Sequence, residues 1–482
     1  MSKETGRIQL FYNSERDLNI PMLYSYLDKS YKESQIETII LIFYIRDCRE
    51  GKGERLLGRK ALGWLFLKDY KTFSKIYTLV PLYGRWDDLV YFWPGVLFPH
   101  NEPIKFIKNN FNIKINENDL KEIKKIQKEI LLYFGQQLIK DRELHLVGKQ
   151  PSRLAKWAPT ENCKIDRSRN VVSTLCKAMG WSKKEYRKNY LSPLRDYLQI
   201  VERYLCDNKV HDLDFDNIPV NALKKYRKKL RDVSPAKYYT RKIFIIEPNN
   251  PYPYQIVRDI RKTGGFFPPI WKSIGKKLKT IKDCLCILDN SPSTNSWYID
   301  DGKDFLPSDI IYSMCLIISE NHSRNFKDTL ITFSTNPTLE KIPKGTLENK
   351  YKHLKLLPWG FVLDIEKVYD LFLTSPKKIP KKFLIISDKK IEDGIINISS
   401  LKSIKKKFDE LDLFFPNILY WNLNYDQVKY PTVTTKNNIE IITGFSDHVI
   451  DALLEGRNFE PLYPVQKVVF SDRYFKIGDL LA

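Results

Sequence analysis

Three oxygen-bearing side chains follow one apolar run of the sequence. Residues 284–288 are apolar, and Asp289, Ser291 and Ser293 come next at alternate positions. Ligands of open α/β sheets bind beyond the carboxyl ends of the strands, so one carboxylate and two hydroxyls could meet there around a hard cation such as Mg²⁺. The same spacing also fits a turn in which Ser and Asp side chains cap the next helix.

A second apolar run ends on another acidic residue. Residues 383–388 read Phe-Leu-Ile-Ile-Ser-Asp, so Asp388 also follows a strand pattern. Because parallel strands end at the same edge of a sheet, we expect its carboxylate near that of Asp289. Residues 359–364 lie between the two runs, just before an amphipathic helix, and would bring a third loop to this edge.

These three loops resemble the metal-ion-dependent adhesion site of a von Willebrand factor A domain. The resemblance implies that Asp289, Ser291, Ser293 and Asp388 surround an ion, with Mg²⁺ as the cofactor and an acidic residue of a protein partner in the open position. Leu363 stands where that family places a threonine, and its side chain offers no oxygen. Asp364 or water would have to substitute for the missing ligand.

The amino-acid composition limits the class of protein. With 482 residues and 43% hydrophobic residues, two or three domains with buried cores are expected. The longest apolar runs are too short for a membrane span, the first residues resemble no signal peptide, and the seven cysteines show no metal or disulfide spacing. We therefore expect a soluble protein of a reducing compartment, in the cytoplasm, with no membrane partner.

The chain carries a large excess of positive charge. Eighty Lys and Arg against 58 Asp and Glu give a net charge of +22, which attracts polyanions such as RNA. Part of the excess can equally reflect AT-rich codons and a solvated surface. Because basic residues gather in a few stretches, the candidate nucleic-acid contacts are Arg49, Lys52, Arg55, Arg85, Arg153, Lys156, Lys224, Lys228 and Arg231.

Each of these stretches has an alternative interpretation. Arg85 would stack on a nucleobase or pack over a tryptophan, and Arg153 and Lys156 lie among short hydrogen-bond donors that suit phosphate. The helix predicted over residues 221–231 presents its cations either to phosphates or to solvent.

The periodicity predicts an α + α/β chain. Apolar residues recur every three or four positions from residue 8 to about residue 240, which indicates stacked helix pairs of a HEAT-like α-solenoid without a strict repeat length. Strand and helix patterns then alternate between residues 284 and 455, which predicts a doubly wound, Rossmann-like sheet. We expect a helical domain over residues 1–242, a linker with a lysine-rich helix over residues 243–280, and the α/β domain over residues 281–482.

Several phrases of the helical part resemble an uncharacterised family of the domain-of-unknown-function 2828 type. That family is found in fungi, plants, bacteria and large DNA viruses, and joins a TROVE-like helical part to a von Willebrand A domain. The matching phrases are residues 46–55, 81–88, 155–159, 186–195 and 201–202. A distant relative is the Ro autoantigen, and the resemblance implies a ring of helices that binds small structured RNAs and threads single-stranded ends.

No catalytic constellation is found in the sequence. The six histidines have neither metal-ligand nor catalytic-motif spacing, and a single ion site without a paired base defines no reaction. We therefore expect no enzyme but an RNA-binding protein, its helical part closing into a ring. The alternatives are a protein-interaction scaffold that uses the α/β domain, and a virion or nucleic-acid-packaging component of a large DNA virus.

Overall fold

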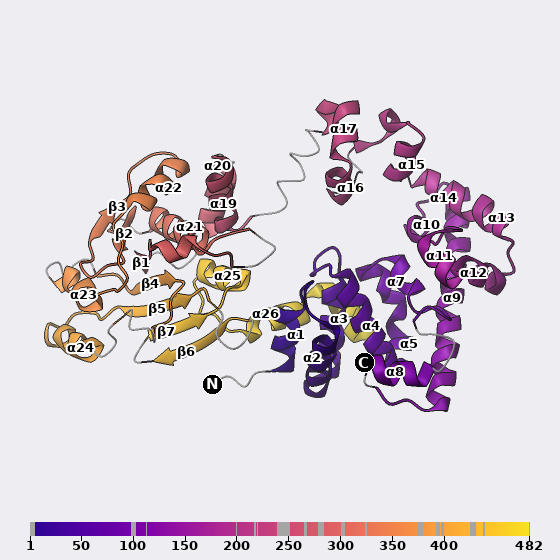
Figure 1. The fold of residues 1–482 in the computed structure, drawn as a ribbon, viewed down its shortest axis with the longest axis horizontal. Coiled ribbons are helices and arrows are strands. Elements are labelled where there is room, and N and C mark those ends of the chain that lie inside the picture. Colours follow the sequence, from indigo (N-terminus) through magenta and orange to yellow (C-terminus); the bar gives the residue numbers. More distant parts are fainter. Residues whose placement is uncertain are drawn as a thin grey trace. The chain divides into compact units, whose positions relative to one another are not determined.

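The computed structural model describes residues 5–97, 103–111, 113–198, 200–215, 218, 220–238, 251–264, 268–277, 284–299, 304–322, 325–373, 379–391, 396, 400–424, 430–436 and 439–481. The chain divides into two compact units, whose elements Figure 1 labels. One is an α/β unit of residues 249–464, and the other is a helical unit of residues 3–248 together with residues 465–482. The predicted fold class, α + α/β, is confirmed.

The α/β unit is built on a seven-stranded sheet with the order β3-β2-β1-β4-β5-β7-β6. The inner strands run parallel, whereas β3 and β6 pair antiparallel at the two edges. The strands are β1 (Cys284–Leu288), β2 (Thr329–Thr332), β3 (Leu339–Lys341), β4 (Lys382–Ser387), β5 (Asn417–Asn422), β6 (Thr432–Lys436) and β7 (Ile439–Thr443). The pattern predicts all five inner strands but neither edge strand, because edge strands lack a continuous apolar run.

Helices cover both faces of this sheet. On one face, α23 (Ile365–Leu373) and α24 (Leu401–Glu410) pack Tyr369 and Phe408 into a buried cluster with Phe383 of β4. On the other face, α21 (Pro307–Asn321) packs against β1, where Cys315 meets Cys286. The unit also contains α19 (Pro253–Thr263), α20 (Pro268–Lys277), α22 (Leu347–Leu356) and α25 (Asp447–Glu455).

Helices α19 and α20 differ from the predicted linker, because they pack in the α/β unit beside α21 (Figure 1). Arg261 of α19 forms two 2.9 Å contacts with the fully buried carboxylate of Asp309 at the start of α21. The indole Nε1 of Trp271 in α20 donates to Glu320 at 2.7 Å. Prolines mark the starts of both helices in the sequence, as expected of residues that interrupt a preceding helix. The ion pair between Arg261 and Asp309 joins distant residues, so no local pattern predicts it.

The helical unit is a stack of helices in which each early helix packs on the next. Its longer helices are α1 (Gly6–Asn13), α2 (Ile20–Glu33), α3 (Gln35–Arg46), α4 (Arg55–Lys68), α8 (Pro103–Phe111), α9 (Glu117–Leu146) and α12 (Val171–Met179). The shorter ones are α5 (Tyr70–Ile76), α6 (Val80–Tyr83), α7 (Trp86–Val90), α10 (Leu154–Trp157), α11 (Lys164–Arg169), α13 (Lys183–Glu185), α14 (Ser192–Tyr197), α15 (Val201–Cys206), α16 (Val220–Lys225) and α17 (Arg227–Val233). Ring closure stays a prediction.

A charged turn, residues 47–54, links α3 to α4. The backbone N–H of Lys52 donates to the Tyr44 carbonyl at 3.0 Å, and that of Glu54 donates to the Ile45 carbonyl at 2.9 Å. These bonds satisfy two of the carbonyls that a helix leaves unpaired at its carboxyl end. The turn therefore caps α3 and folds back over it.

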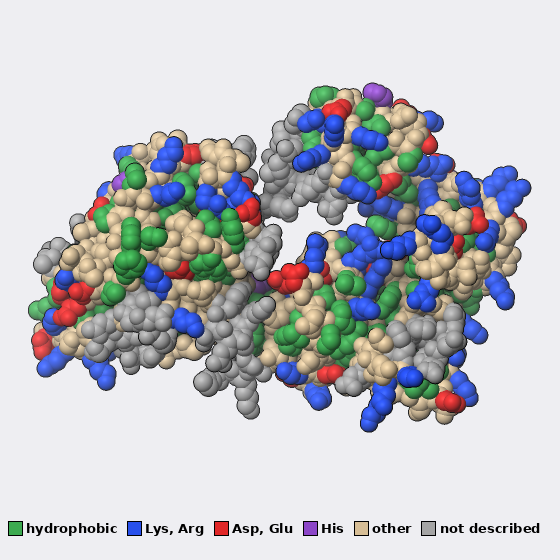
Figure 2. Space-filling model, in the orientation of Figure 1, with side chains coloured by type: hydrophobic (Ala, Val, Ile, Leu, Met, Phe, Trp, Pro, Cys, Tyr) green, Lys and Arg blue, Asp and Glu red, His purple; other side chains and the backbone are tan. Residues whose placement is uncertain are grey.

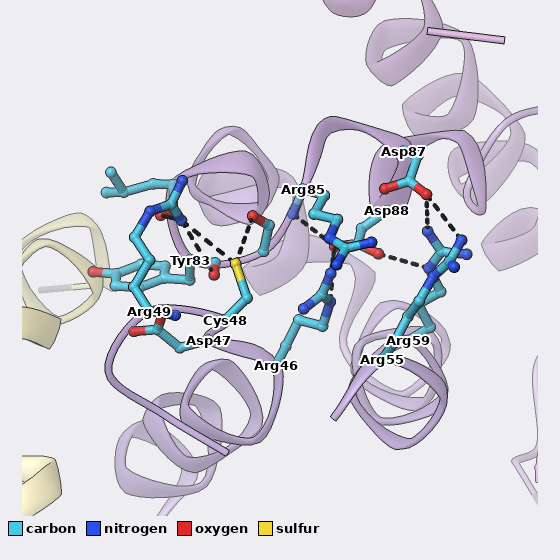
Figure 3. A network of polar contacts seen from close by, with 12 residues as sticks. Arg46, Asp47, Cys48, Arg49, Arg55, Arg59, Tyr83, Arg85, Asp87 and Asp88 are labelled. Atoms are coloured by element: carbon cyan, nitrogen blue, oxygen red, sulfur yellow. Dashed lines mark hydrogen bonds and ion pairs between the residues drawn. The ribbon is translucent and has the colours of Figure 1, made fainter. Parts of the chain in front are cut away.

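A buried ion pair joins this turn to the start of α7 (Figure 3). The guanidinium of Arg46 contacts the carboxylate of Asp88 at 2.7 and 2.8 Å, and both side chains are essentially inaccessible to solvent. Arg59 of α4 contacts the same carboxylate at 2.6 Å. Gly58 and Gly84 make room for the pair: a Cβ on Gly58 would lie 2.7 Å from Arg46, and one on Gly84 would collide with Asp88.

The last residues of the chain belong to the helical unit, which differs from the predicted boundary of the α/β domain at residue 482. Helix α26 (Leu462–Val469) crosses the division, and α27 (Phe475–Leu481) packs on α3 and α5. Arg473 contacts the buried carboxylate of Asp47 at 2.8 and 3.1 Å, and the Tyr474 hydroxyl donates to it at 3.1 Å. A long-range ion pair therefore fixes the carboxyl end, and no local pattern announces it.

Because Asp88 is buried with Arg46 and Asp87 is not, we expect substitutions of these two adjacent residues to lower the unfolding free energy by very different amounts. Asp88→Ala leaves Arg46 buried without its counter-charge, so we expect the helical unit to lose about 3–5 kcal/mol of unfolding free energy. Asp87→Ala removes partly exposed ion pairs with Arg55 and Arg59, but Arg59 keeps its contact with Asp88, so the substitution should cost only about 1 kcal/mol. Urea denaturation followed by circular dichroism measures both, and equal losses would contradict this assignment.

Candidate functional site

The four side chains predicted at the sheet edge lie together. Because Leu288 of β1 is paired with Ile386 of β4, the loops after both strands emerge side by side. The Ser293 hydroxyl donates to Asp388 Oδ1 at 3.0 Å and lies 3.2 Å from the hydroxyl of Ser291. The backbone N–H of Ser291 donates to Asp289 Oδ1 at 3.0 Å. The Asx turn and the shared edge that the spacing suggests are therefore both present.

Other groups also contact the two carboxylates. The Ser387 hydroxyl donates to Asp289 Oδ2 at 2.6 Å, and the Trp297 indole donates to Asp388 Oδ2 at 3.2 Å. Burial raises the pKa of Asp388, and the neighbouring charge of Asp289 raises it further, while the hydrogen bonds from Trp297 and Ser293 oppose the shift. The edge therefore holds two crowded carboxylates whose oxygens already accept hydrogen bonds.

The described side chains at this edge fit a magnesium ion poorly. Leu363, at the position of the expected third-loop ligand, is fully buried and its backbone bridges to Ile396. Asp364 caps α23 by accepting from the Lys367 N–H at 3.2 Å, and it pairs with the Lys367 ammonium at 3.6 Å. No group of three or more His, Cys, Asp or Glu side chains that could hold a metal is found in the described part of the chain. Magnesium stays a prediction.

The helical unit contains a large cavity of about 1220 Å³. Two acidic residues, Glu161 and Glu202, line it, whereas the cationic residues that line it are Arg49, Arg85, Arg153, Lys156, Arg187, Arg195, Arg203 and Lys225. Figure 2 shows Lys and Arg side chains gathered over α7 and α10 in this part of the surface. The cavity therefore presents a strongly positive lining, and four of its members are residues predicted from the sequence.

The side chains of four lining cations make no hydrogen bond or ion pair with any described side chain: Arg85, Arg153, Lys156 and Arg187. The two acidic residues are engaged elsewhere, Glu161 with Lys183 at 3.5 Å and Glu202 with the Tyr226 hydroxyl at 3.3 Å. Burial lowers the pKa of Lys156, and Arg153 and Arg85 lower it further, although Glu202 opposes them. Such mutual repulsion is relieved when an anion binds.

Arg85 stacks on Trp157 rather than on its neighbour Trp86. Its guanidinium carbon lies 4.3 Å from the centre of the Trp157 ring, and the Lys156 ammonium lies 5.5 Å from the same centre. Trp86 instead stacks on Tyr133 of α9. The packing interpretation of Arg85 is confirmed, and the stacking places a planar cation in the cavity wall.

Other lining cations hold the wall together. Arg195 donates to the carbonyls of Ala155 and Ala158 at 2.8 and 2.9 Å and to the Thr160 hydroxyl at 3.1 Å. Arg49 donates to the Leu82 carbonyl at 2.7 Å. Both guanidiniums are therefore structural, since they satisfy acceptors at chain turns.

A π-helical turn over Tyr186–Leu191 forms one side of the cavity. The buried Tyr186 hydroxyl donates to the Pro159 carbonyl at 2.8 Å, and Arg187 next to it is exposed. π-Helical turns are rare and occur frequently at functional sites. Sequence reasoning grouped residues 186–195 as a family phrase but did not select Arg187, whose position depends on this turn.

The remaining predicted contacts lie elsewhere. Lys52 donates to the Tyr12 carbonyl at 3.3 Å, and Arg55 pairs with Asp87 at 3.0 Å. Lys228 and Arg231 lie exposed on α17, where Arg231 donates to Asp232 at 3.2 and 3.3 Å. The side chain of Lys224 lies outside the described residues. The structure therefore brings Arg49, Arg85, Arg153 and Lys156 together and leaves the others apart.

Comparisons with known proteins place two family segments in the chain. Residues 113–239 match the family described as "Domain of unknown function (DUF2828)", which confirms the family resemblance drawn from the sequence. Residues 283–472 match "Domain of unknown function (DUF7788)". The first segment includes Arg153, Lys156 and Arg187 of the cavity, and the second includes the whole sheet.

One similar protein comes from a giant virus. An uncharacterised protein of Acanthamoeba polyphaga mimivirus is 22% identical over 94% of this chain and 83% of its own length. Among solved structures, the Ro (RSR) protein of Deinococcus radiodurans covers 94% of this chain and 87% of its own, at 11% identity and a TM-score of 0.37. At that degree of likeness no residue or function is carried over from it.

The two classes of arginine in the cavity predict different costs of substitution. Arg195→Lys keeps the charge but cannot reach the three acceptors together, so we expect the helical unit to lose about 2 kcal/mol of unfolding free energy. Arg187→Lys removes no hydrogen bond and should change it by less than about 0.5 kcal/mol. Urea denaturation of both variants tests this, and a harmless Arg195→Lys would show that its bonds do not stabilise the wall.

Proposed function

We propose that the chain is a non-enzymatic RNA-binding protein that holds RNA in the cavity of the helical unit, part of whose lining lies in the DUF2828 segment. The observation that carries this proposal is a group of four cationic side chains that have no hydrogen bond or ion pair among the described residues, Arg85, Arg153, Lys156 and Arg187, in a cavity of about 1220 Å³. A net charge of +22 draws polyanions to the chain, and the unpaired group gives them a defined place to bind.

The chemistry of the cavity suits a phosphodiester chain with exposed bases. One arginine guanidinium can donate two parallel hydrogen bonds to the oxygens of a phosphate, and a lysine ammonium attracts the same phosphate as a compact positive charge. Arg85, whose guanidinium lies over the Trp157 ring, offers a planar cation on which an unpaired base can stack. Single-stranded RNA, whose bases are free to stack, is therefore the favoured form.

RNA affinity should depend on the cavity and on salt. We expect Arg153→Glu and Arg187→Glu each to weaken binding of a labelled single-stranded RNA by about tenfold, the loss of one charged hydrogen bond. Each should also reduce the slope of log affinity against log salt by about 0.7, the value for one phosphate contact on a single strand. Fluorescence anisotropy at several salt concentrations measures both quantities.

Lys228→Glu is the matched control, because Lys228 is an exposed cation of the same unit outside the cavity lining. It should leave the affinity within about twofold of the wild-type value. If Lys228→Glu weakens binding while the two cavity variants do not, the RNA lies along α17 and the cavity is excluded. If RNA binds none of the proteins, the proposal itself is wrong.

A second candidate function rests on exposed apolar residues of the α/β unit. Leu356 and Phe361 expose 84% and 70% of their surface, and Trp359 and Val362 lie in the same stretch. Contiguous apolar surface of this kind is typical of a protein-binding site, which favours a scaffold that docks a partner through this loop.

The scaffold candidate is separable from RNA binding. A Phe361→Ser variant should lose a co-purifying protein that the wild-type chain retains, with RNA affinity unchanged, because the loop and the cavity belong to different units. Cross-linking in the native host followed by mass spectrometry identifies the protein. If the wild-type protein and the Phe361→Ser variant cross-link to the same proteins, the scaffold function is contradicted.

A virion or nucleic-acid-packaging role stays a prediction, and the similarity to a mimivirus protein is the observation in its favour. Within the described residues, no helix combines the length and apolar character needed to cross a bilayer.

A further inference from the structure

A lysine ammonium lies beside the carboxylates of the sheet edge. Lys389 directly follows Asp388 at the end of β4, and its Nζ lies 3.8 Å from Oδ2 of the fully buried Asp289. That nitrogen is buried and makes no hydrogen bond with the described residues. A buried positive charge is stable only beside a negative one, so its position is set by the charge of Asp289.

The backbone around Lys389 fixes the direction of its side chain. Its N–H donates to the Ser387 hydroxyl at 3.2 Å, and its carbonyl accepts from the Tyr420 hydroxyl at 2.8 Å. The ammonium lies 5.4 Å from the centre of the Phe333 ring and 6.0 Å from that of Phe361. The ammonium therefore lies near the faces of two aromatic rings, which attract it.

The oxygens of this edge are already occupied by donors from the chain. Asp289 accepts from the Ser291 N–H and the Ser387 hydroxyl, and Asp388 accepts from the Ser293 hydroxyl and the Trp297 indole. A divalent ion would have to replace several of these bonds. It would also approach within a few ångströms of a buried ammonium.

We propose that the Lys389 ammonium takes the place of the divalent cation at this sheet edge, so that the α/β unit keeps its three loops together without metal. One tethered charge offsets Asp289, while hydrogen bonds from Ser293 and Trp297 hold Asp388. Leu363 belongs to the buried apolar core and supplies no side-chain oxygen to this edge. This inference is independent of RNA binding, which belongs to the helical unit.

Metal titration of the full chain tests the proposal. The melting temperature of the wild-type protein, followed by circular dichroism, should be the same in EDTA, in Mg²⁺ and in Mn²⁺. Lys389→Met keeps the aliphatic bulk but removes the charge, so it should melt ~10 °C lower in EDTA. It should recover more than half of that loss in Mn²⁺, because the freed carboxylate gains a cation. Lys405→Met, an exposed lysine of α24, is the matched control and should behave as wild type.

Three results would overturn the proposal. The first is calorimetric binding of Mn²⁺ by the wild-type chain that Asp289→Asn abolishes. The second is a Lys389→Met variant that melts with the wild type in EDTA. The third is a destabilised Lys389→Met that gains nothing from Mn²⁺. Should this variant fail to fold in EDTA, refolding in Mn²⁺ decides: recovery supports the proposal, and failure in both overturns it.

Discussion

The buried contact between Arg46 and Asp88 is the constraint on which the helical unit depends. A guanidinium and a carboxylate removed from water must meet in a fixed geometry, because either one alone would carry an uncompensated charge. Their meeting fixes the end of α3 against the start of α7, and Arg59 of α4 joins the same carboxylate. Residues near both partners also make long-range contacts: Asp47, which follows Arg46, receives Arg473, and Arg85, three residues before Asp88, lies over Trp157 in the cavity wall.

The two units treat positive charge in opposite ways. In the α/β unit, the buried ammonium of Lys389 lies beside Asp289 and near an aromatic ring, so its charge serves the fold. In the helical unit, Arg153 and Arg187 are exposed and have no acidic partner among the described residues. Structural cations such as Arg195 stand next to these unpaired ones in the same wall. Charge alone therefore does not distinguish cations that stabilise the fold from those that have no acceptor among the described residues.

Much of the fold could be predicted from the sequence because local patterns encode it. The apolar runs ending at Leu288 and Ser387 are parallel neighbours, so Asp289 and Asp388 emerge at one edge as expected. The interactions that could not be predicted join residues far apart. Nothing near Asp47 indicates that Arg473 will pair with it, and nothing in the phrase around Lys389 indicates that its ammonium turns inward.

The same limit applies to the cavity. Arg153 and Lys156 were predictable as candidate contacts because they lie in a basic stretch rich in hydrogen-bond donors. Arg187 was not, because only the π-helical turn and the stacking of α10 with α14 bring it to the same wall. Lys228 and Arg231 form a one-sided basic stripe in the sequence, yet they do not line the cavity. Helical periodicity shows which side chains share a face, but not which faces enclose a space.

The position of residues 465–482 in the helical unit has a consequence for synthesis on the ribosome. The helical unit is discontinuous in the chain, since the α/β unit is inserted between residue 248 and its final segment. During translation the sheet is complete before Arg473 emerges, so Asp47 has no counter-charge while more than four hundred residues are added. The helical unit, whose residues are made first, is thus the last to complete its fold. A chain truncated before residue 465 would contain a complete α/β unit attached to an incomplete helical unit.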